Sequence, residues 1–397
     1  MMQKIIIVCY NYELSQFPKE PDPENRFYTY GFGGTFGRLF AHHLNNYEFE
    51  VWRLDGNVKE KFYENIIDGI RYKVFRALTI KKLGLVSMKF IKELKNEAKK
   101  SKPIFFIVHT HNFQTYQVAF FLKNSMIITT HHGDWSPYYV YENSNGLRKL
   151  RAFLGIAAEK VTFKHIDYFL VCDYKQVPYI KRSATDAEWI IFSSGLDVNK
   201  FTVIDKFQAR KMLGLDQDKK YILYVGKLYK YKQIEELLKI WDEIKIEHPE
   251  IDLLLVGNEP KGSWGEEYYD MAERYGAKII GRVLNNELYK YYCAADVYVL
   301  MALRHDNFGG TGIAPLESLA CNTPVVSNSM QNYLGDNAAE VCEMPETLED
   351  YKHAILKVIA NPGKYKNMRE SVEKFYAHNI TAKRADMVFK KVLNKYN

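Results

Sequence analysis

The sequence has no apolar run close to the roughly 18 residues that a membrane-spanning helix needs. Its first apolar run, KIIIVC, is short and soon followed by an acidic residue, and it lacks the small-residue cleavage site of a secretory signal. Glycine and proline are sparse, at 23 and 12 of 397 residues, which excludes collagen-like and low-complexity chains. We therefore expect a globular cytoplasmic protein that opens on a buried strand.

Cysteine is scarce as well. The five cysteines are odd in number, widely spaced and without CxxC or Cys/His ligand patterns, so we expect reduced core thiols. Two neighbouring predicted strands end in histidines, one in His109 and His111 and the other in His131 and His132, but no carboxylate cluster stands beside them in the sequence. We predict no metal site.

Positive charge is in excess but unevenly spread. The net charge is +7, whereas residues 71–102 alone carry 11 basic and 2 acidic side chains, which leaves −2 for the rest of the chain. No RNA or DNA motif with interleaved aromatic residues accompanies this segment, so we expect no nucleic-acid partner. Its stretch LGLVSMKFIKELKNEAKK has the amphipathic pattern of a surface helix, with an apolar face from Leu83 to Ala98. A solvated helix face and a site for an anionic membrane surface both remain open.

Short apolar runs alternate with helical patterns along the whole chain, which is typical of repeated βα units and parallel sheets. One series of predicted strands runs from KIIIVC to WIIFSS and a second from YILYVG to TPVVS, with a polar linker between them. We predict two α/β domains, residues 1–198 and 199–376, and a final helix over residues 377–397. Ligands of open α/β sheets bind beyond the carboxyl ends of the strands, so function is expected in the loops there.

Two such loops lie in the first half. GFGGTFGR, residues 31–38, is predicted to follow the first strand and open a helix, and its glycines suit either a tight turn or close approach of the backbone to an anion. TTHHGDWSP places His132 at the end of a strand. There it can donate a hydrogen bond to a sugar hydroxyl or phosphate, or be an ordinary loop histidine.

Two more loops lie in the second half. In VGKLYKYKQ, Lys227 and Lys232 precede a helix, and their charges together with the helix dipole suit a pyrophosphate; solvated surface lysines are the alternative. In NFGGTGIAPLESLACNTPVVS, a glycine-rich loop enters a helix that carries Glu317. Its backbone N–H groups can hold phosphate charge, and Glu317 can accept both hydroxyls of a ribose or be a plain carboxylate on the helix surface.

This last segment resembles the signature of retaining GT-B glycosyltransferases of family 4, E-G-F-G-x4-E-A-M-A-C-G-x-P-V-V, from Gly312 through Glu317 to Val326. VGKLYKYKQ resembles the family's V-G-R-L-x3-K-G, TTHHG its T-x-H-G, and SSGLDVNKF its N-G-V-D-x3-F. The motifs follow the family's order and span essentially the whole chain. The resemblance implies a GT-B fold, with two Rossmann-like domains facing a central cleft and the last helix crossing back to the first domain. The nucleotide-sugar would bind in the second domain and the acceptor mainly in the first.

The resemblance also assigns roles by position. Lys227 and Lys232 would bind the diphosphate of the donor, and Glu317 its ribose. The amides of Gly310, Thr311 and Gly312 would contact the phosphate or the sugar, and His132 would contact the transferred sugar. Val283 would lie near the base, and Gly33 and Gly34 would line the cleft.

The sequence departs from the family pattern at three places: at Gly309, at Thr311, where the family has phenylalanine, and at Asn322. The first glutamate of the family's E-x7-E pair falls on Gly309, and we predict that Asp306 replaces it. Asn322 stands at the usual glycine, and asparagine tolerates the left-handed backbone conformation. Asp216-Gln217-Asp218 has the spacing of a DxD metal motif but lies in the linker, so we interpret it as a solvated turn.

The resemblance thus predicts a retaining, metal-independent glycosyltransferase of glycan biosynthesis, which moves a sugar from a nucleoside diphosphate sugar to a glycan or lipid-linked acceptor. No tightly bound cofactor is expected. A lipid-linked acceptor would suit peripheral docking of residues 71–102 on the inner face of the membrane. The alternatives are a nucleotide-sugar 2-epimerase of the same fold and a catalytically silent sugar-binding protein.

Overall fold

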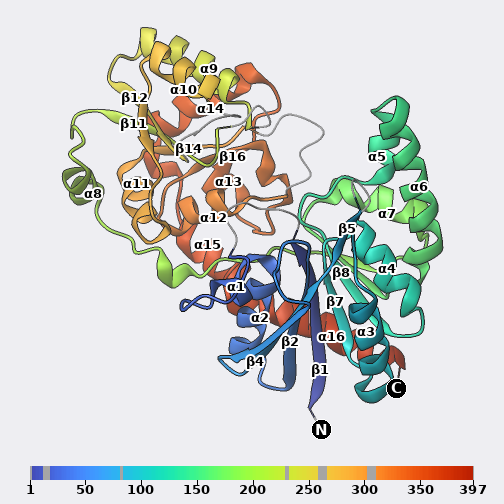
Figure 1. Ribbon diagram of the computed structural model, residues 1–397. Coiled ribbons are helices and arrows are strands. Elements are labelled where there is room, and N and C mark those ends of the chain that lie inside the picture. The colour runs from blue at the N-terminus through green and yellow to red at the C-terminus, as the bar shows by residue number, and fades with distance from the viewer. Residues whose placement is uncertain are drawn as a thin grey trace. The chain divides into compact units, whose positions relative to one another are not determined.

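The computed structural model describes residues 2–11, 18–80, 84–228, 232–257, 266–301 and 310–396 (Figure 1). The chain divides into two compact units, one of residues 1–194 with 381–397 and one of residues 195–380. The division falls after Ser194 and not after residue 198 because Leu196 already bonds within the second unit: its N–H donates to the carbonyl of Tyr376 at 2.8 Å.

The first unit is built on an eight-stranded sheet in the order β10-β9-β8-β7-β1-β2-β4-β3, in which only the β3–β4 pair is antiparallel. All the strands predicted in this half are present. The edge strand β3 was not predicted, since in its sequence FYENII the polar Glu64 and Asn65 interrupt the apolar residues and no residue is fully buried. The strands are β1 (Gln3–Asn11), β2 (Tyr47–Asp55), β3 (Phe62–Ile67), β4 (Ile70–Arg76), β7 (Ile104–Val108), β8 (Met126–Thr130), β9 (Tyr168–Val171) and β10 (Trp189–Ile191), with a separate hairpin of β5 (Leu78–Ile80) and β6 (Gly84–Val86).

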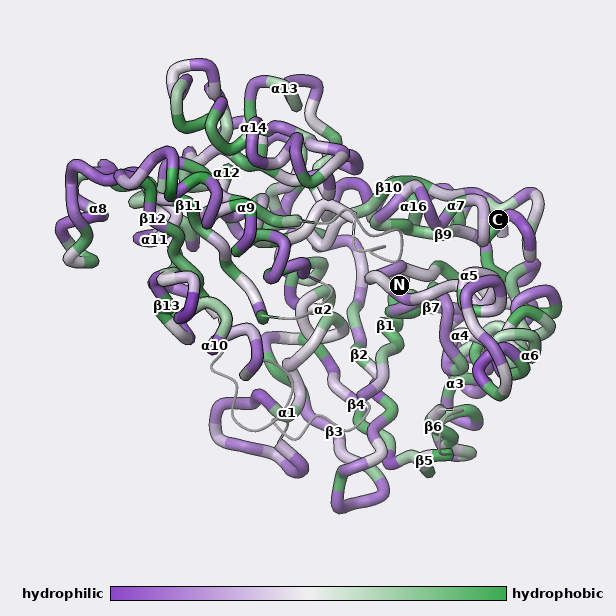
Figure 2. The backbone as a smooth tube through the Cα atoms, turned by 90° about the horizontal axis from the view of Figure 1, so that it is seen from above, coloured by the Kyte–Doolittle hydropathy of each residue, from purple (hydrophilic) through white to green (hydrophobic). Residues whose placement is uncertain are grey.

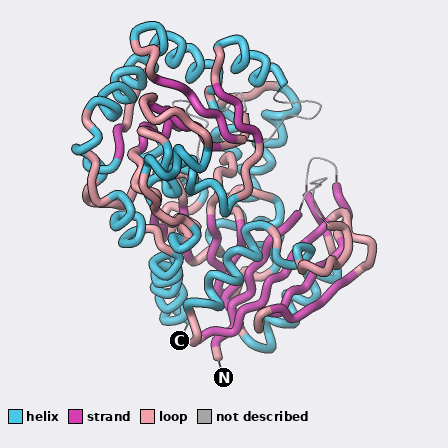
Figure 3. The backbone as a smooth tube through the Cα atoms, turned by 90° about the vertical axis from the view of Figure 1, so that its left-hand side faces the viewer, coloured by secondary structure: helices cyan, strands magenta, loops and turns pink. Residues whose placement is uncertain are grey.

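Helices cover both faces of this sheet (Figure 3). One buried cluster joins the sheet to α2 and α16, and a second joins its other face to α3, α4 and α7. From Thr381 onward, α16 belongs to the first unit although it lies at the end of the chain. The helices are α1 (Arg26–Thr29), α2 (Gly31–His43), α3 (Met88–Ser101), α4 (Phe113–Phe121), α5 (Pro137–Glu142), α6 (Gly146–Thr162), α7 (Val177–Ser183) and α16 (His378–Tyr396).

Two predicted boundaries in this unit are wrong. Residues 31–38 are not a loop that leads into a helix, because α2 is already helical from Gly31. The basic helix does not begin near Leu83, which lies outside the described residues, but at Met88. Residues 84–86 form β6, and Ser87 caps α3 by accepting the N–H of Phe90 at 3.4 Å.

The second unit has a six-stranded parallel sheet in the order β13-β12-β11-β14-β15-β16. Numbered along the chain within the unit, this order is 3-2-1-4-5-6, as in a Rossmann fold, with the order reversing between β11 and β14. The strands are β11 (Lys220–Val225), β12 (Ile251–Val256), β13 (Lys278–Gly281), β14 (Val297–Val299), β15 (Val325–Val326) and β16 (Cys342–Glu343). The helices are α8 (Lys206–Leu213), α9 (Ile234–Glu247), α10 (Glu266–Tyr275), α11 (Leu288–Ala294), α12 (Ile313–Ala320), α13 (Ala338–Val341), α14 (Leu348–Ala360) and α15 (Met368–Phe375).

The predicted linker is part of this second unit. Within it, α8 packs beside α11, and the side chains of Arg210 and Lys206 each reach the carboxylate of Asp296 at 2.8 Å. The strands β1, β11 and β12 are largely hydrophobic (Figure 2), which fits their burial under helices, whereas β3 at the sheet edge is mixed. Within the described ranges, no helix is both long and apolar enough to cross a membrane.

Candidate functional site

The carboxyl ends of β7 and β8 bring four histidines together. The rings of His109 and His132 lie 5.6 Å apart, and those of His111 and His131 lie 5.9 Å apart, measured between centroids. In the first sheet the strand order reverses between β1 and β7, so this is the edge where open α/β sheets bind ligands. The placement of the histidines at strand ends, as predicted, explains why they meet.

Asp134 joins the loops that follow these two strands. Its carboxylate contacts His109 Nδ1 at 2.5 Å and accepts the backbone N–H groups of Thr110 at 2.6 Å and His111 at 3.2 Å. Burial raises the pKa of this carboxyl, but His109, with smaller contributions from His131 and His111, outweighs burial, and the pKa lies well below its usual range. The sequence analysis missed Asp134, although the motif HHGDW carried the signal two residues after His132.

A second carboxylate lies deeper. Glu159 of α6 is fully buried and contacts His111 Nδ1 at 2.7 Å while accepting the Tyr116 hydroxyl at 2.8 Å. Burial lowers the pKa of His111, but the negative charge of Glu159 outweighs it and the pKa is raised. No local pattern in the sequence marks Glu159, since only tertiary packing brings α6 to this strand end.

His132, the predicted sugar contact, has an aromatic neighbour that the sequence analysis did not identify. Its ring stacks on Phe32 of α2 at 4.2 Å between centroids and 15° between planes, and its Nε2 lies 3.0 Å from Thr130 Oγ1. Burial, with help from the nearby His109, lowers the pKa of His132 to about 3. His132 is therefore neutral near pH 7. Phe32 is 43% exposed and presents an apolar ring beside it.

Gly33 and Gly34 lie on the buried side of α2. A Cβ added to Gly33 would come within 2.4 Å of Cys9 Sγ, and one on Gly34 within 1.9 Å of the Thr29 carbonyl oxygen. Both glycines are needed for close packing of this helix, whatever they contribute to a ligand.

Within the described ranges, no three His, Cys, Asp or Glu side chains are grouped to hold a metal ion.

In the second unit, Glu317 lies on α12 and is 7% exposed. It accepts the hydroxyl of Tyr292 from α11 at 2.7 Å, and burial raises its pKa. It is therefore an inward-facing, hydrogen-bonded group and not a carboxylate on the helix surface. Tyr292 is a neighbour of Glu317 that the sequence analysis missed.

The loop after β11 carries the two predicted lysines. Lys227 is the second residue after β11, and its backbone carbonyl oxygen accepts the Tyr224 hydroxyl at 2.8 Å. Lys232 lies two residues before α9 and is partly buried, and burial lowers the pKa of its ammonium group. Gly257, the residue after β12, lies close to this loop: a Cβ added to it would come within 2.1 Å of the carbonyl oxygen of Gly226.

The glycine-rich loop is described from Gly310 onward, so Asp306 and Gly309 lie outside the described residues. Gly310 has a left-handed φ of 64°, Thr311 donates its hydroxyl to the Ser329 carbonyl at 3.3 Å, and Gly312 caps the start of α12. Val283 follows β13 and packs against the core.

Two smaller predictions are confirmed. Asn322 has a φ of 57°, so asparagine does occupy the left-handed turn at the usual glycine. Asp216 and Asp218 are exposed, and Asp216 accepts the N–H of Asp218 at 2.9 Å within a surface turn.

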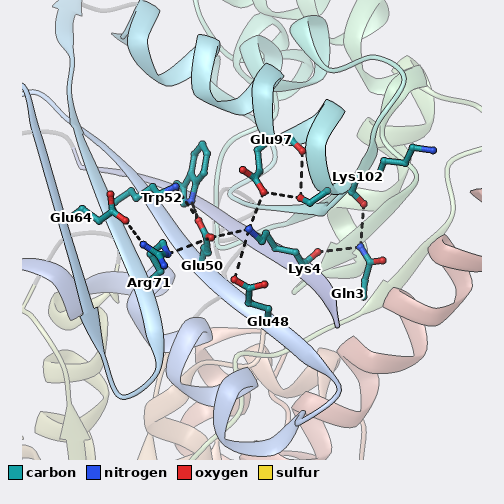
Figure 4. Close-up of polar contacts among 11 residues, drawn as sticks. Gln3, Lys4, Glu48, Glu50, Trp52, Glu64, Arg71, Glu97 and Lys102 are labelled. Atoms are coloured by element: carbon teal, nitrogen blue, oxygen red, sulfur yellow. Dashed lines mark hydrogen bonds and ion pairs between the residues drawn. The ribbon is translucent and has the colours of Figure 1, made fainter. Parts of the chain in front are cut away.

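The segment over residues 71–102 is only partly an open basic surface. Figure 4 shows Arg71 of β4 paired with Glu64 and lying 3.7 Å from Glu50, while Lys4 bridges Glu50 at 3.0 Å and Glu97 of α3 at 2.8 Å. Of the basic residues on β4, Arg71 and Lys73 thus lie beside carboxylates, whereas Arg76 is exposed and donates to the Lys59 carbonyl.

The exposed charge of this segment lies on α3. Lys92, Lys99 and Lys100 are exposed on the helix, whose Phe90, Ile91 and Leu94 are turned into the core. The outward face of α3 is consequently charged along most of its length, with the exposed Met88 at its start.

The sequence profile of the family "Glycosyl transferases group 1" matches residues 205–375. An uncharacterized glycosyltransferase of Methanocaldococcus jannaschii is 23% identical over 291 residues, which are 69% of each chain. Other curated relatives match over less, as in Actinosynnema mirum, where the D-inositol 3-phosphate glycosyltransferase is 26% identical over 46% of each chain.

Solved structures match over nearly the whole chain. The sucrose-phosphate synthase of Thermosynechococcus elongatus has a TM-score of 0.70 at 19% identity, covering 99% of this chain and all of that one. Anabaena HepE, solved with UDP and glucose, has a TM-score of 0.64 at 11% identity, covering 98% of this chain and all of that one. Residues 205–375, within the second unit, thus match the group 1 glycosyltransferase family, and the chain as a whole has the fold of GT-B glycosyltransferase structures.

Proposed function

We propose that this protein transfers a sugar, with retention of anomeric configuration and without a metal ion, from a nucleoside diphosphate sugar to a glycan or lipid-linked acceptor. The observation that carries the proposal is that the family-matching unit contains both the partly buried Lys232 just before α9 and the buried Glu317 on α12. The first group suits a diphosphate and the second a ribose. HepE, which was solved with UDP and glucose, supports a donor of this class.

In this mechanism Lys232 and Lys227 stabilise the negative charge that builds on the departing diphosphate. An ammonium group that is partly removed from water interacts more strongly with an anion than a solvated one does. The backbone amides from Gly310 to Gly312 add donors at the start of α12, where the helix dipole also favours negative charge. Such groups lower the barrier because the charge is larger in the transition state than in the bound donor. The acceptor attacks from the face that the diphosphate leaves, and the leaving phosphate takes its proton.

The lysine at position 232 gives the first prediction. Lys232→Ala should lower kcat by roughly 100- to 1,000-fold under saturating donor, the usual effect of removing one preorganised donor. The matched control is Lys239→Ala, which removes an exposed lysine of α9 paired with Glu235 and should leave kcat unchanged. Release of UDP, GDP or ADP from the corresponding sugar donors measures both. A wild-type rate in the Lys232 variant would remove it from the mechanism.

The same assay separates transfer from the other reactions of the fold. A panel of UDP, GDP and ADP in calorimetry identifies the base. Slow hydrolysis of the matching donor without acceptor is expected of a transferase, whereas a free hexose epimerised at C2 would indicate the epimerase. Binding without any turnover would indicate a silent sugar-binding protein.

For the acceptor side, we propose that α3 docks electrostatically on an anionic membrane on the cytoplasmic face. Its exposed lysines contribute about 1 kcal/mol each near such a surface. Sedimentation with anionic vesicles, weakening as salt is raised, is the expected result. Equal binding to neutral vesicles would contradict an electrostatic site.

A further inference from the structure

Helix α6 leaves its large apolar side chains in solvent. Leu147, Leu150, Leu154 and Val161 are 71%, 56%, 56% and 48% exposed. Their spacing of three, four and seven residues places them on one stripe of the helix. The helix lies at the outer edge of the first unit in two perpendicular views (Figures 1 and 2).

The opposite face of α6 fixes this orientation. It buries Ala152, Glu159 and Thr162, all small or polar, and Gly155 lets it approach α5 so closely that an added Cβ would lie 3.0 Å from the Pro137 ring. Glu159 is held by His111 and Tyr116 at the strand end. Rotating the leucines inward would expose this network, so the helix cannot hide its apolar stripe within its own unit.

The charges beside the stripe are of one sign. Arg148, Arg151 and Lys160 are exposed on α6, whereas its one acidic residue, Glu159, is fully buried. A helix with an apolar stripe flanked by exposed cations fits an anionic bilayer, where the leucines enter the boundary of the acyl chains and the cations meet lipid phosphates. Pairing of α6 with the same helix of a second copy would instead bring these like charges together.

We propose that α6 is the apolar anchor by which this protein binds the surface of an anionic lipid bilayer. This site is distinct from α3, which buries Phe90, Ile91 and Leu94 and exposes a single large apolar side chain, that of Met88 at its first residue. It also does not depend on the transfer reaction, because binding needs no donor. Two contributions of different kind then act together: attraction by cations and insertion by leucines.

Vesicle binding of the full-length protein tests the anchor. In Leu150→Ser/Leu154→Ser, binding to phosphatidylcholine vesicles that contain phosphatidylglycerol should fall by about tenfold or more, because the inserted apolar area is lost. The matched control, Ile246→Ser, removes a 75% exposed apolar residue of α9 and should bind like the wild type. Arg151→Gln/Lys160→Gln should weaken binding mainly at low salt.

A second measurement does not rely on loss of binding. An environment-sensitive fluorophore on Leu150→Cys should shift to the blue when anionic vesicles are added, whereas the same label on Ile246→Cys should not. The absence of a fluorescence shift, or wild-type binding by the leucine double variant, would overturn the anchor. Wild-type binding by the leucine variant together with loss of binding in Lys92→Gln/Lys99→Gln would assign membrane binding to α3 alone. A concentration-dependent dimer lost in the leucine variant, with no vesicle binding, would assign α6 to a second copy and equally overturn it.

Discussion

Asp134 shows how a single side chain holds two strand ends in place. Its carboxylate contacts His109 and accepts two backbone N–H groups, those of Thr110 and His111, from the loop after the neighbouring strand. An asparagine would keep the shape but lose the charge, and its amide would place a donor against donors. Asp134→Asn should therefore lower the free energy of unfolding by on the order of 1 to 3 kcal/mol near pH 7.

The stability contribution of Asp134 should depend on pH in a defined direction. The pKa of Asp134 is lowered in the folded protein, so its contribution is complete above the pKa of an unfolded aspartate, about 4, and is lost as the pH falls below that value. Urea unfolding of wild type and variant should show a constant difference between pH 6 and 8 and a shrinking one below about pH 4. A difference that persists unchanged in acid would attribute the effect to packing and not to charge.

Glu317 carries the next prediction at this scale. If it accepts the two ribose hydroxyls, Glu317→Ala should lower affinity for the free nucleoside diphosphate by on the order of 2 to 4 kcal/mol, since water recovers part of each lost hydrogen bond. Tyr292→Phe is the comparison variant, because it removes the hydroxyl that Glu317 accepts at 2.7 Å and leaves the carboxylate itself in place. Calorimetry should show a smaller loss for it. Wild-type affinity in Glu317→Ala would reject the ribose role.

The site residues divide according to where their signal lies in the sequence. The positions of His109, His111 and His132 could be predicted because the end of an apolar run marks the end of a buried strand. Neighbouring parallel strands then bring these ends to the same edge of the sheet. Glu317 was found through a motif. Glu159 could not be found, since its partners come from segments more than forty residues away and only the packing of α6 unites them.

At the scale of secondary-structure elements, the next prediction is that the glycines of α2 are needed for packing. A Cβ at position 34 would meet the backbone carbonyl of Thr29 at 1.9 Å, and backbone cannot move aside cheaply. Gly34→Ala should therefore cost about 1 to 3 kcal/mol of unfolding free energy, the range for overpacking. Gly363→Ala, where nothing lies within 4 Å of the added carbon, is the control and should change stability by less than about 0.5 kcal/mol. A stable Gly34 variant with impaired acceptor turnover would instead favour the ligand-lining role.

The buried parallel strands were the easiest elements to predict, and the edges were the hardest. IFFIVH and IDLLLVG are apolar throughout because helices cover both faces of their sheets. The strand β3 pairs at an edge, and the pair of β5 and β6 has three residues in each strand with β5 exposed, so neither leaves a long apolar run. The helix α3 was predicted five residues too early because the apolar period continues into β6, and only the Ser87 cap marks where the helix begins.

At the scale of the whole molecule, the two-unit organisation follows from a pattern that appears twice in the sequence. Each half supplies its own series of buried strands and therefore its own core. The exception is α16, whose residues Ala382 and Phe389 belong to the first core although some two hundred residues separate them from the rest of it. Amphipathic periodicity predicts that such a helix exists, but not which core it joins; that expectation came from the family resemblance.

Removing one aromatic side chain of α16 should consequently destabilise one unit selectively. Phe389 packs edge-on against Phe40 and Tyr47 of the first unit, with ring centroids 5.6 Å apart in both pairs. Phe389→Ala should cost about 3 to 5 kcal/mol, as buried phenylalanine truncations do. Met387→Ala, at a 61% exposed position of the same helix, is the control. Hydrogen exchange followed by mass spectrometry should show faster exchange in peptides from β1, β2 and β7 and unchanged exchange in those from β11 and β12. Equal acceleration in both sets would mean that the two cores unfold as one cooperative body, which would contradict their separation into two units with α16 serving only the first.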